Sequence, residues 1–152
     1  TEAQTLTVIL TDRPLLTLHD LSIGRYGTTL EKRRGDGRTP LGQFRVTDVK
    51  RDSAFHRFIA LSYPDAERAA RGRQHGDIGA SELRAILAAH RKGKSPPQDT
   101  FLGGGIGIHG LGKADPALHR AMNWTRGCVA VTDRQLDSLL PWVEIGMQVD
   151  IR

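Results

Sequence analysis

Short runs of alternating apolar and polar residues dominate the chain, and glycine or proline separates most of them. The clearest runs are Leu6 to Leu10, Leu15 to Leu18, Gln43 to Lys50, Phe58 to Leu61 and Met147 to Ile151. Alternation with a period of two is typical of strands that bury one face. Because Thr11-Asp12-Arg13-Pro14, between the first two runs, is a turn signal, we expect the chain to open with a β-hairpin.

Helical periodicity is confined to the middle and the end of the chain. Apolar residues recur at helical spacing from Ser81 to Arg91, and Ser81 is a suitable cap for this helix. Shorter helices are predicted from Pro64 to Arg71, from Pro116 to about Met122 after the cap Asp115, and after Thr132, which can form a capping box with Gln135.

Together these segments predict one mainly β domain over residues 1–152. Short strands separated by turns favour a β-sandwich or an open barrel with a few short helices. We interpret residues 63–103 as a helical insertion into this domain. The polar segment EKRRGDGRTPLG, residues 31–42, has no P-loop spacing, so we interpret it as a tight turn between strands rather than a phosphate loop.

Composition excludes several classes of protein. No apolar run approaches the length of a membrane span, and the opening residues TEAQTLTVIL lack the features of a signal peptide. A single cysteine excludes an internal disulfide and a cysteine-rich zinc site, and none of the six histidines has a second ligand at metal spacing. We therefore expect no metal and no cofactor. The net charge of +5 indicates anionic partners: nucleic acid, a membrane surface or an acidic polymer.

The glycine-rich stretch from Gly103 to Val131 carries the candidate chemistry. His109 ends one short apolar run, and Cys128 begins another. If these runs are neighbouring strands, the imidazole lies beside the thiol and can generate the attacking thiolate. Gly127 lets a substrate carbonyl approach the backbone, so the amides of Gly127 and Cys128 are candidates for an oxyanion hole.

Structural explanations exist for each of these residues. A lone cysteine before a strand is most often a small buried apolar residue. Arg126 either acts on the thiol or a substrate carboxylate through its charge, or simply faces solvent. Trp124 either contacts a substrate or, as tryptophans more commonly do, packs its loop.

The order of the motifs resembles the L,D-transpeptidase catalytic domain family, the YkuD type. The resemblance rests on His109-Gly110 and on Thr125-Arg126-Gly127-Cys128-Val129, with Arg126 where the family usually has histidine. Four features are similar to the YafK-like branch of the family. They are the arginine at position 126, Gly35 to Gly42, Ser62-Tyr63-Pro64 and Pro96 to Thr100. The resemblance implies a β-sandwich with helices decorating one end, and we expect the insertion to overhang the active cleft.

The resemblance also implies roles for the site residues. Cys128 is the nucleophile, His109 the general base, and the backbone carbonyl of Gly110 orients the imidazole. Thr125, Arg126, Trp124 and Tyr63 are the candidate substrate-binding residues.

The function implied is attack by Cys128 on peptidoglycan stem tetrapeptides through a thioester, in the periplasm or cell envelope. An amine acceptor gives transpeptidation; water gives hydrolysis, including release of a wall-linked lipoprotein. The alternative of another class is a non-enzymatic basic module that binds the wall polymer. Nucleic acid is disfavoured as a partner, because the positive charge is scattered and aromatic residues make up only 5% of the chain.

Overall fold

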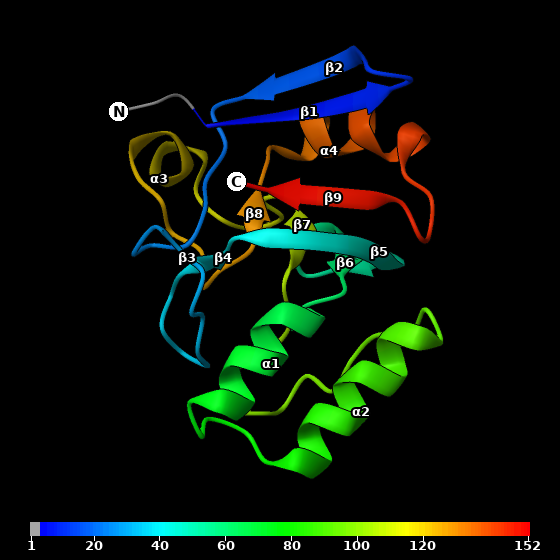
Figure 1. Ribbon diagram of the computed structural model, residues 1–152. Coiled ribbons are helices and arrows are strands. Elements are labelled where there is room, and N and C mark those ends of the chain that lie inside the picture. The colour runs from blue at the N-terminus through cyan, green and yellow to red at the C-terminus, as the bar shows by residue number, and fades with distance from the viewer. Residues whose placement is uncertain (1–3) are drawn as a thin grey trace.

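A five-stranded sheet lies at the centre of the computed structural model, which describes residues 4–152; the first three residues of the predicted domain lie outside this range. Across the sheet the strands follow the order β8-β7-β6-β5-β9 (Figure 1). They are β5 Gly42–Ser53, β6 His56–Leu61, β7 Gly107–His109, β8 Val129–Ala130 and β9 Gln148–Ile151. Neighbouring strands are antiparallel except β7 and β8, which run parallel.

The opening hairpin covers one face of this sheet. It consists of β1 (Thr5–Leu10) and β2 (Arg13–His19), so the turn is shorter than predicted. Together with α4 (Asp133–Leu139) it lies above the sheet in Figure 1. The hairpin, the sheet and α4 share one buried cluster, which includes Val8, Leu18, Phe44, Val46, Ile59, Leu61, Leu136 and Leu139. Since burial of each large apolar side chain contributes roughly 1.5–3 kcal/mol, this cluster is the main core of the fold.

Two helices pack together below the sheet, around a smaller cluster of Ala69, Ile78, Ile86 and Leu102 (Figure 1). They are α1 (Ala66–Gln74) and α2 (Ala80–Arg91), and both predicted starts are wrong. Asp65 caps α1, because its side chain accepts the N–H of Arg68 at 3.0 Å. Gly79 rather than Ser81 caps α2, where the Glu82 side chain accepts the Gly79 N–H at 2.8 Å.

Residues 31–42 do not form the predicted tight turn. β3 (Thr28–Thr29) and β4 (Thr39–Pro40) pair in parallel, and parallel strands need a longer connection, so residues 30–38 form an extended loop. This loop packs against the start of the glycine-rich stretch: the Arg34 N–H donates to the Phe101 carbonyl at 2.9 Å, and a Cβ on Gly103 would lie 3.2 Å from Arg34 Cα.

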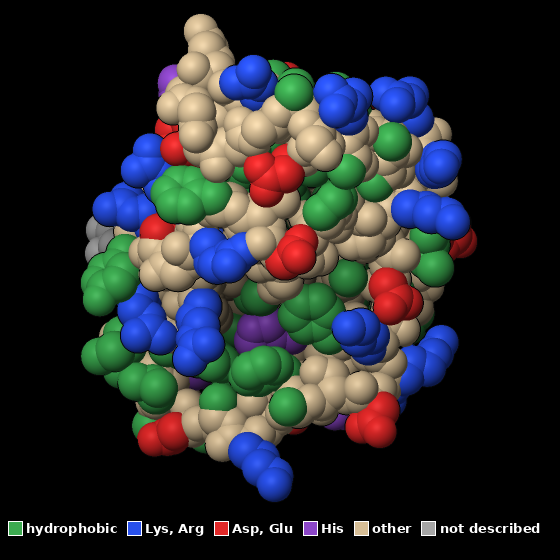
Figure 2. Space-filling view, turned by 90° about the horizontal axis from the view of Figure 1, so that it is seen from below, with side chains coloured by type: hydrophobic (Ala, Val, Ile, Leu, Met, Phe, Trp, Pro, Cys, Tyr) green, Lys and Arg blue, Asp and Glu red, His purple; other side chains and the backbone are tan. Residues whose placement is uncertain are grey.

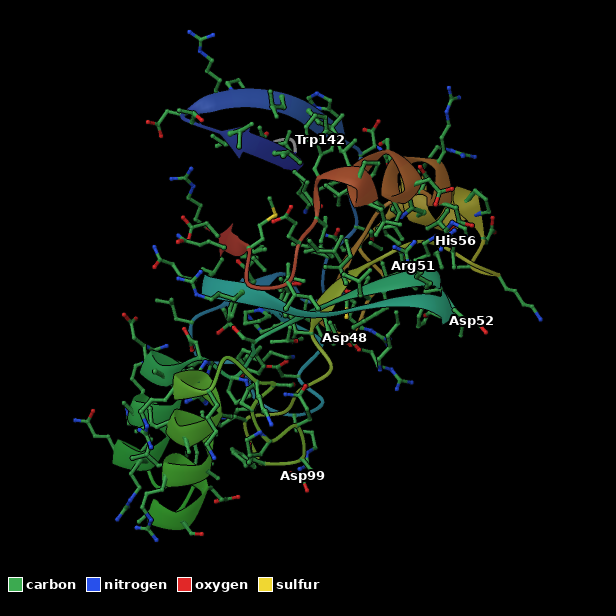
Figure 3. The ribbon with its side chains drawn as sticks, turned by 90° about the vertical axis from the view of Figure 1, so that its right-hand side faces the viewer. Asp48, Arg51, Asp52, His56, Asp99 and Trp142 are labelled. Carbon is green, nitrogen blue, oxygen red and sulfur yellow. The ribbon has the colours of Figure 1, made fainter. Side chains whose placement is uncertain are left out.

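The remaining helices begin where the sequence predicts. Asp115 caps α3 (Pro116–Ala121), and Thr132 forms its capping box with Gln135 at the start of α4. Pro141 ends α4 through a short 3-10 turn, η1 (Leu140–Trp142), which lies beside the hairpin (Figure 3). The same view places Arg51, Asp52 and His56 at the far tip of the β5–β6 hairpin.

The prediction of a mainly β fold with a few short helices is confirmed. Of the helices in residues 4–152, none combines the length and the apolar character that crossing a membrane requires.

Candidate active site

His109 is the last residue of β7, and the backbone fixes its tautomer. Its Nδ1 lies 2.7 Å from the carbonyl oxygen of Gly110. A carbonyl oxygen only accepts, so Nδ1 carries the proton and donates it to Gly110. In the neutral ring Nε2 therefore keeps its lone pair, which is the state that a general base needs. The ring is buried, with 3% of the residue exposed.

Cys128 stands on the same face of the sheet as His109. The parallel register pairs His109 with Ala130 and Ile108 with Val129, so continuing it by one residue sets Cys128 opposite Gly107. Because side chains alternate along a strand, Cys128 and His109 project to the same side. Gly107 adds no side chain between them. The thiol of Cys128 donates to the Gly105 carbonyl at 3.1 Å, so this bond breaks before the proton moves elsewhere.

Cys128 and His109 line one pocket of about 500 Å³. Its apolar walls are Phe55, Phe58 and Trp124, and the ring of Phe55 lies 4.4 Å from that of His109. Its polar lining is completed by Arg25, Gly105, Thr125 and Arg126. Figure 2 shows a hollow in which a histidine is bordered by hydrophobic side chains, with Lys and Arg spread around it.

The loop before Cys128 is held by hydrogen bonds within itself and to residues 22–25. The Thr125 hydroxyl donates to the Cys128 carbonyl at 2.7 Å and accepts the Gly127 N–H at 3.1 Å. The buried Ser22 hydroxyl donates to the Met122 carbonyl and accepts the Trp124 N–H, both at 3.1 Å. These bonds fix the position from which the Cys128 thiol faces the pocket.

The Gly127 amide is therefore already occupied. Its N–H donates to Thr125, which counts against the predicted oxyanion role of Gly127 in this conformation. The glycine is needed for another reason. Its φ of 141° is disfavoured for other residues, and an added Cβ would lie 2.7 Å from the Arg38 carbonyl and 3.0 Å from Lys32 Nζ.

Lys32 lies beneath this loop and is only 3% exposed. Its Nζ donates to Asp36 Oδ1 and to the Arg38 carbonyl, both at 2.8 Å, and to the Arg126 carbonyl at 3.4 Å. A buried ammonium needs such a carboxylate partner to offset its desolvation. Lys32 thereby ties the loop of residues 30–38 to the loop that carries the thiol.

Burial determines the protonation state of Cys128 and His109. It raises the pKa of Cys128 to about 11, outweighing a backbone hydrogen bond from Gly107 and the charge of Lys32, which both lower it. Burial also lowers the pKa of His109, outweighing the hydrogen bond to Gly110. At neutral pH both groups are therefore uncharged, and the site is a thiol beside a neutral base.

Trp124 packs its loop and also lines the pocket. Its Nε1–H donates to Nδ1 of the buried His119 at 3.3 Å, and its ring meets that of His109 edge to face at 5.9 Å between centroids. Trp124 therefore packs its loop, and its contact with a substrate stays a prediction.

The assignment of Tyr63 to substrate binding is wrong. Tyr63 is 1% exposed, and its hydroxyl donates to the carbonyls of Leu102 (2.7 Å) and Lys32 (3.2 Å) in the core. The insertion does not overhang the cleft either, because no residue of α1 or α2 is among those that line the pocket; only Gly105, just after the insertion, reaches it.

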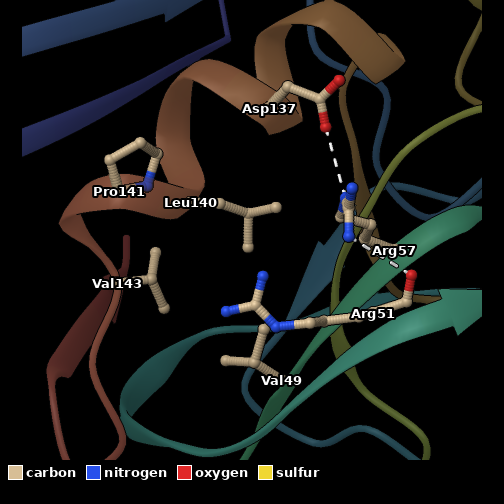
Figure 4. A pocket seen from close by; sticks show the side chains of 7 residues that line it. All are labelled: Val49, Arg51, Arg57, Asp137, Leu140, Pro141 and Val143. Carbon is tan, nitrogen blue, oxygen red and sulfur yellow. Dashed lines mark hydrogen bonds and ion pairs between the residues drawn. The ribbon is translucent and has the colours of Figure 1, made fainter.

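A second hollow lies away from this pocket, between β5 and the end of α4 (Figure 4). Val49, Leu140, Pro141 and Val143 form its apolar part, and Asp137 accepts from Arg57 at 3.4 Å. Its only carboxylate, Asp137, is also paired with His56 at 2.8 Å, and no cysteine, serine or threonine lines this hollow, so we assign it no catalytic role. Within residues 4–152, no three His, Cys, Asp or Glu side chains gather in a way that could hold a metal ion.

Sequence reasoning missed three contributors to the site. Arg25 lies between the predicted hairpin and the segment of residues 31–42, where the sequence motifs point to no site residue. Lys32 sits in a segment that we interpreted as a turn, and Phe58 looked like an ordinary core residue. For Arg25 and Lys32 the available signal was the glycines nearby in the sequence, since glycine marks close approach of backbone segments; the sequence around Phe58 has no such signal.

Comparisons with known proteins agree with this fold. The model of the L,D-transpeptidase catalytic domain family, YkuD, matches residues 1–151. The fold is similar to that of the helical cell shape determining protein Pgp2 from Campylobacter jejuni, with a TM-score of 0.57 and 20% identity. Its K307A mutant gives a TM-score of 0.60, also at 20% identity. Bd1075 from Bdellovibrio bacteriovorus gives 0.51 at 18% identity.

These alignments cover 91–92% of this chain but only 38–39% of the two proteins, so the chain spans well under half of their length. No curated protein matched in a sequence comparison. At this level of identity the structural likeness concerns the fold alone, whereas the family match covers nearly the whole chain. The chain belongs to the L,D-transpeptidase catalytic domain (YkuD) family, whose members act on peptidoglycan.

Proposed function

We propose that the chain is a cysteine acyltransferase that acts on peptidoglycan stem tetrapeptides, with Cys128 as nucleophile and His109 as general base. The observation that carries this proposal is the pocket lined by both side chains, together with the Gly110 carbonyl that leaves His109 Nε2 unprotonated. The substrate class comes from the family to which the chain belongs.

In the first half-reaction, Cys128 gives up its hydrogen bond to Gly105, and its proton passes to His109 Nε2. The sulfur then attacks a peptide carbonyl carbon, and the oxygen takes up the negative charge near the Cys128 N–H. As the C–N bond breaks, the leaving amine takes the proton from His109, and a thioester remains.

In the second half-reaction, His109 takes a proton from an incoming amine or from water. The nucleophile attacks the thioester carbon, the C–S bond breaks, and the thiol recovers its proton. An amine gives a new peptide bond; water gives hydrolysis, of a stem peptide or of the link to a wall-attached lipoprotein. From this substrate we infer that the protein acts in the cell envelope or periplasm.

Intact-protein mass spectrometry after incubation with a tetrapeptide-stem muropeptide tests this function. The wild type should gain the mass of an acyl group, and Cys128→Ala should not. His109→Asn should acylate roughly 10³-fold more slowly or worse. His19→Asn, which changes an exposed histidine on the hairpin, is the matched control and should behave as wild type.

The released products then separate cross-linking from hydrolysis. Tight binding of the muropeptide without any adduct or product would contradict the enzymatic proposal. That result would favour the basic wall-binding module instead.

A further inference from the structure

Two arginines lie side by side at the Cys128 pocket. A parallel bridge pairs Gly24 with Thr125, and the Arg25 N–H donates to the Thr125 carbonyl at 2.9 Å. This pairing brings Arg25 next to Arg126, one residue before the Gly127-Cys128 pair. Both arginines line the pocket that holds the thiol.

Neither guanidinium has an acidic partner among the described residues. No Asp or Glu lines the pocket, and no ion pair within 4.0 Å involves Arg25 or Arg126 in residues 4–152. Other arginines are paired: Arg68 with Asp77 at 3.2 Å and Arg71 with Glu31 at 2.6 Å. Two neighbouring unpaired cations repel each other, so an anion between them removes an unfavourable interaction.

The lining of the pocket also includes an aromatic surface. Phe55, Phe58 and Trp124 supply this surface. A ligand that suits both kinds of lining carries a negative charge together with apolar groups. Arg25 and Arg126 are both exposed, so their guanidinium groups are accessible to a ligand, and guanidinium groups bind carboxylates through two parallel hydrogen bonds.

Distance limits where the carboxylate can lie on the ligand. Arg126 and Cys128 are separated by one residue, and a residue spans at most about 3.6 Å of extended chain. A carboxylate one or two residues from the attacked carbonyl therefore falls within reach of the arginine side chains while the carbonyl faces Cys128. A remote charge on a long polymer does not meet this condition.

We propose that Arg25 and Arg126 form a carboxylate-binding subsite that selects acyl donors with a free carboxylate within one or two residues of the attacked carbonyl. This subsite rests on the proposed function for its substrate, a peptide, but its binding is testable without turnover. In this subsite Arg126 acts together with Arg25, which lies about 100 residues earlier in the sequence.

The test compares a tetrapeptide stem with the same peptide carrying a C-terminal carboxamide. Binding of each to Cys128→Ala protein is measured by calorimetry, so no reaction is needed. The carboxylate form should bind at least tenfold more tightly, because a charged hydrogen bond contributes about 1.5–3 kcal/mol and 1.4 kcal/mol is tenfold. Adding Arg25→Gln or Arg126→Gln should remove most of this preference and leave the carboxamide's affinity unchanged.

Arg84→Gln on the exposed side of α2 is the matched control and should keep the full preference. Equal binding of acid and amide, absence of binding by both, or an unchanged preference in the two arginine variants would overturn the subsite. Acylation of wild-type Cys128 by the acid form is measured in parallel. Acylation without acid preference refutes the subsite alone, whereas acid-selective binding without acylation refutes the proposed function alone.

Discussion

At the scale of single residues, the absence of a side chain at Gly107 shapes the site. A Cβ there would lie 2.4 Å from the Ile59 carbonyl oxygen and 2.5 Å from the ring of Phe58. Phe58 therefore occupies the space next to β7 and forms a wall of the pocket. An alternating strand pattern does not reveal this, because the sequence shows where a glycine is but not which ring fills its place.

One prediction at this scale concerns the protonation of the Cys128 thiol. With its pKa raised to about 11 and no charged imidazole beside it, the thiol should react slowly with iodoacetamide at neutral pH. The rate should climb steadily from about pH 7 to pH 10 without levelling off, because the thiolate fraction keeps rising over this range. Alkylation is read by intact mass, and the chain has only one cysteine.

A rate plateau between about pH 5 and pH 8 would contradict this expectation. Such a plateau is the mark of a thiolate–imidazolium pair with a depressed thiol pKa. Phe101→Leu, an exposed change outside the pocket lining, serves as the control for general effects of mutation.

At the scale of elements, the Thr125 hydroxyl makes the hydrogen bonds within the loop that joins α3 to β8. Thr125→Val removes the acceptor of the Gly127 N–H and the donor to the Cys128 carbonyl at nearly constant volume. Leaving such groups unsatisfied costs about 1–3 kcal/mol, so urea unfolding should show a loss of this size, together with slower acylation. Thr125→Ser should retain most of both properties.

Thr17→Val on the exposed face of the hairpin is the comparison, and its loss should stay within about 0.5 kcal/mol. If Thr125→Val were as stable and as reactive as the wild type, the loop would be held by other contacts.

Local sequence patterns predicted the helices and strands better than they predicted the contacts between these elements. The hairpin and the Thr132–Gln135 capping box depend on residues that are close in sequence, and both formed as expected. Ser81 failed as a cap because Gly79 provides the extended backbone and Glu82 supplies the side-chain acceptor. The prediction of a tight turn over residues 31–42 was wrong because β3 and β4 pair in parallel, and no local sequence pattern indicates that pairing.

At the scale of the whole molecule, two buried histidines link stability to pH. Burial lowers the pKa of both His109 and His119 from 6.5. Below about pH 6.5 the unfolded chain binds more protons than the folded one, so stability is present above this pH and is lost as the pH falls. The melting temperature should therefore decrease between about pH 7.5 and pH 5.5, a window above ordinary carboxyl titration.

Scanning calorimetry measures this slope. His119→Asn should flatten it, whereas His19→Asn, on the exposed hairpin, should leave it unchanged. A melting temperature that is constant or rises towards pH 5.5 would contradict the assignment of these two histidines as neutral in the folded state.

The sequence motifs identified Cys128, His109, Gly110 and the neighbours of the thiol, and the structure gathers them at one end of β7 and β8. The roles of these residues remain predictions. Arg25, Lys32 and the burial of Tyr63 could not be read from the sequence, because each depends on packing between segments that are far apart along the chain. Sequence motifs identify the candidate reacting groups, whereas the residues that surround these groups are determined by the complete fold.

The bonds from Ser22 to the loop before Cys128 join residues 100 or more positions apart. Contacts of such long sequence separation form late, since a large loop must close before they contribute. Ser22 is synthesised about 100 residues before the loop that it supports, so these hydrogen bonds can form only after residues 122–124 have been added. The nucleophile acquires its oriented surroundings only when both segments are present and paired, so a fragment without residues 22–25 carries a cysteine whose loop lacks these hydrogen bonds.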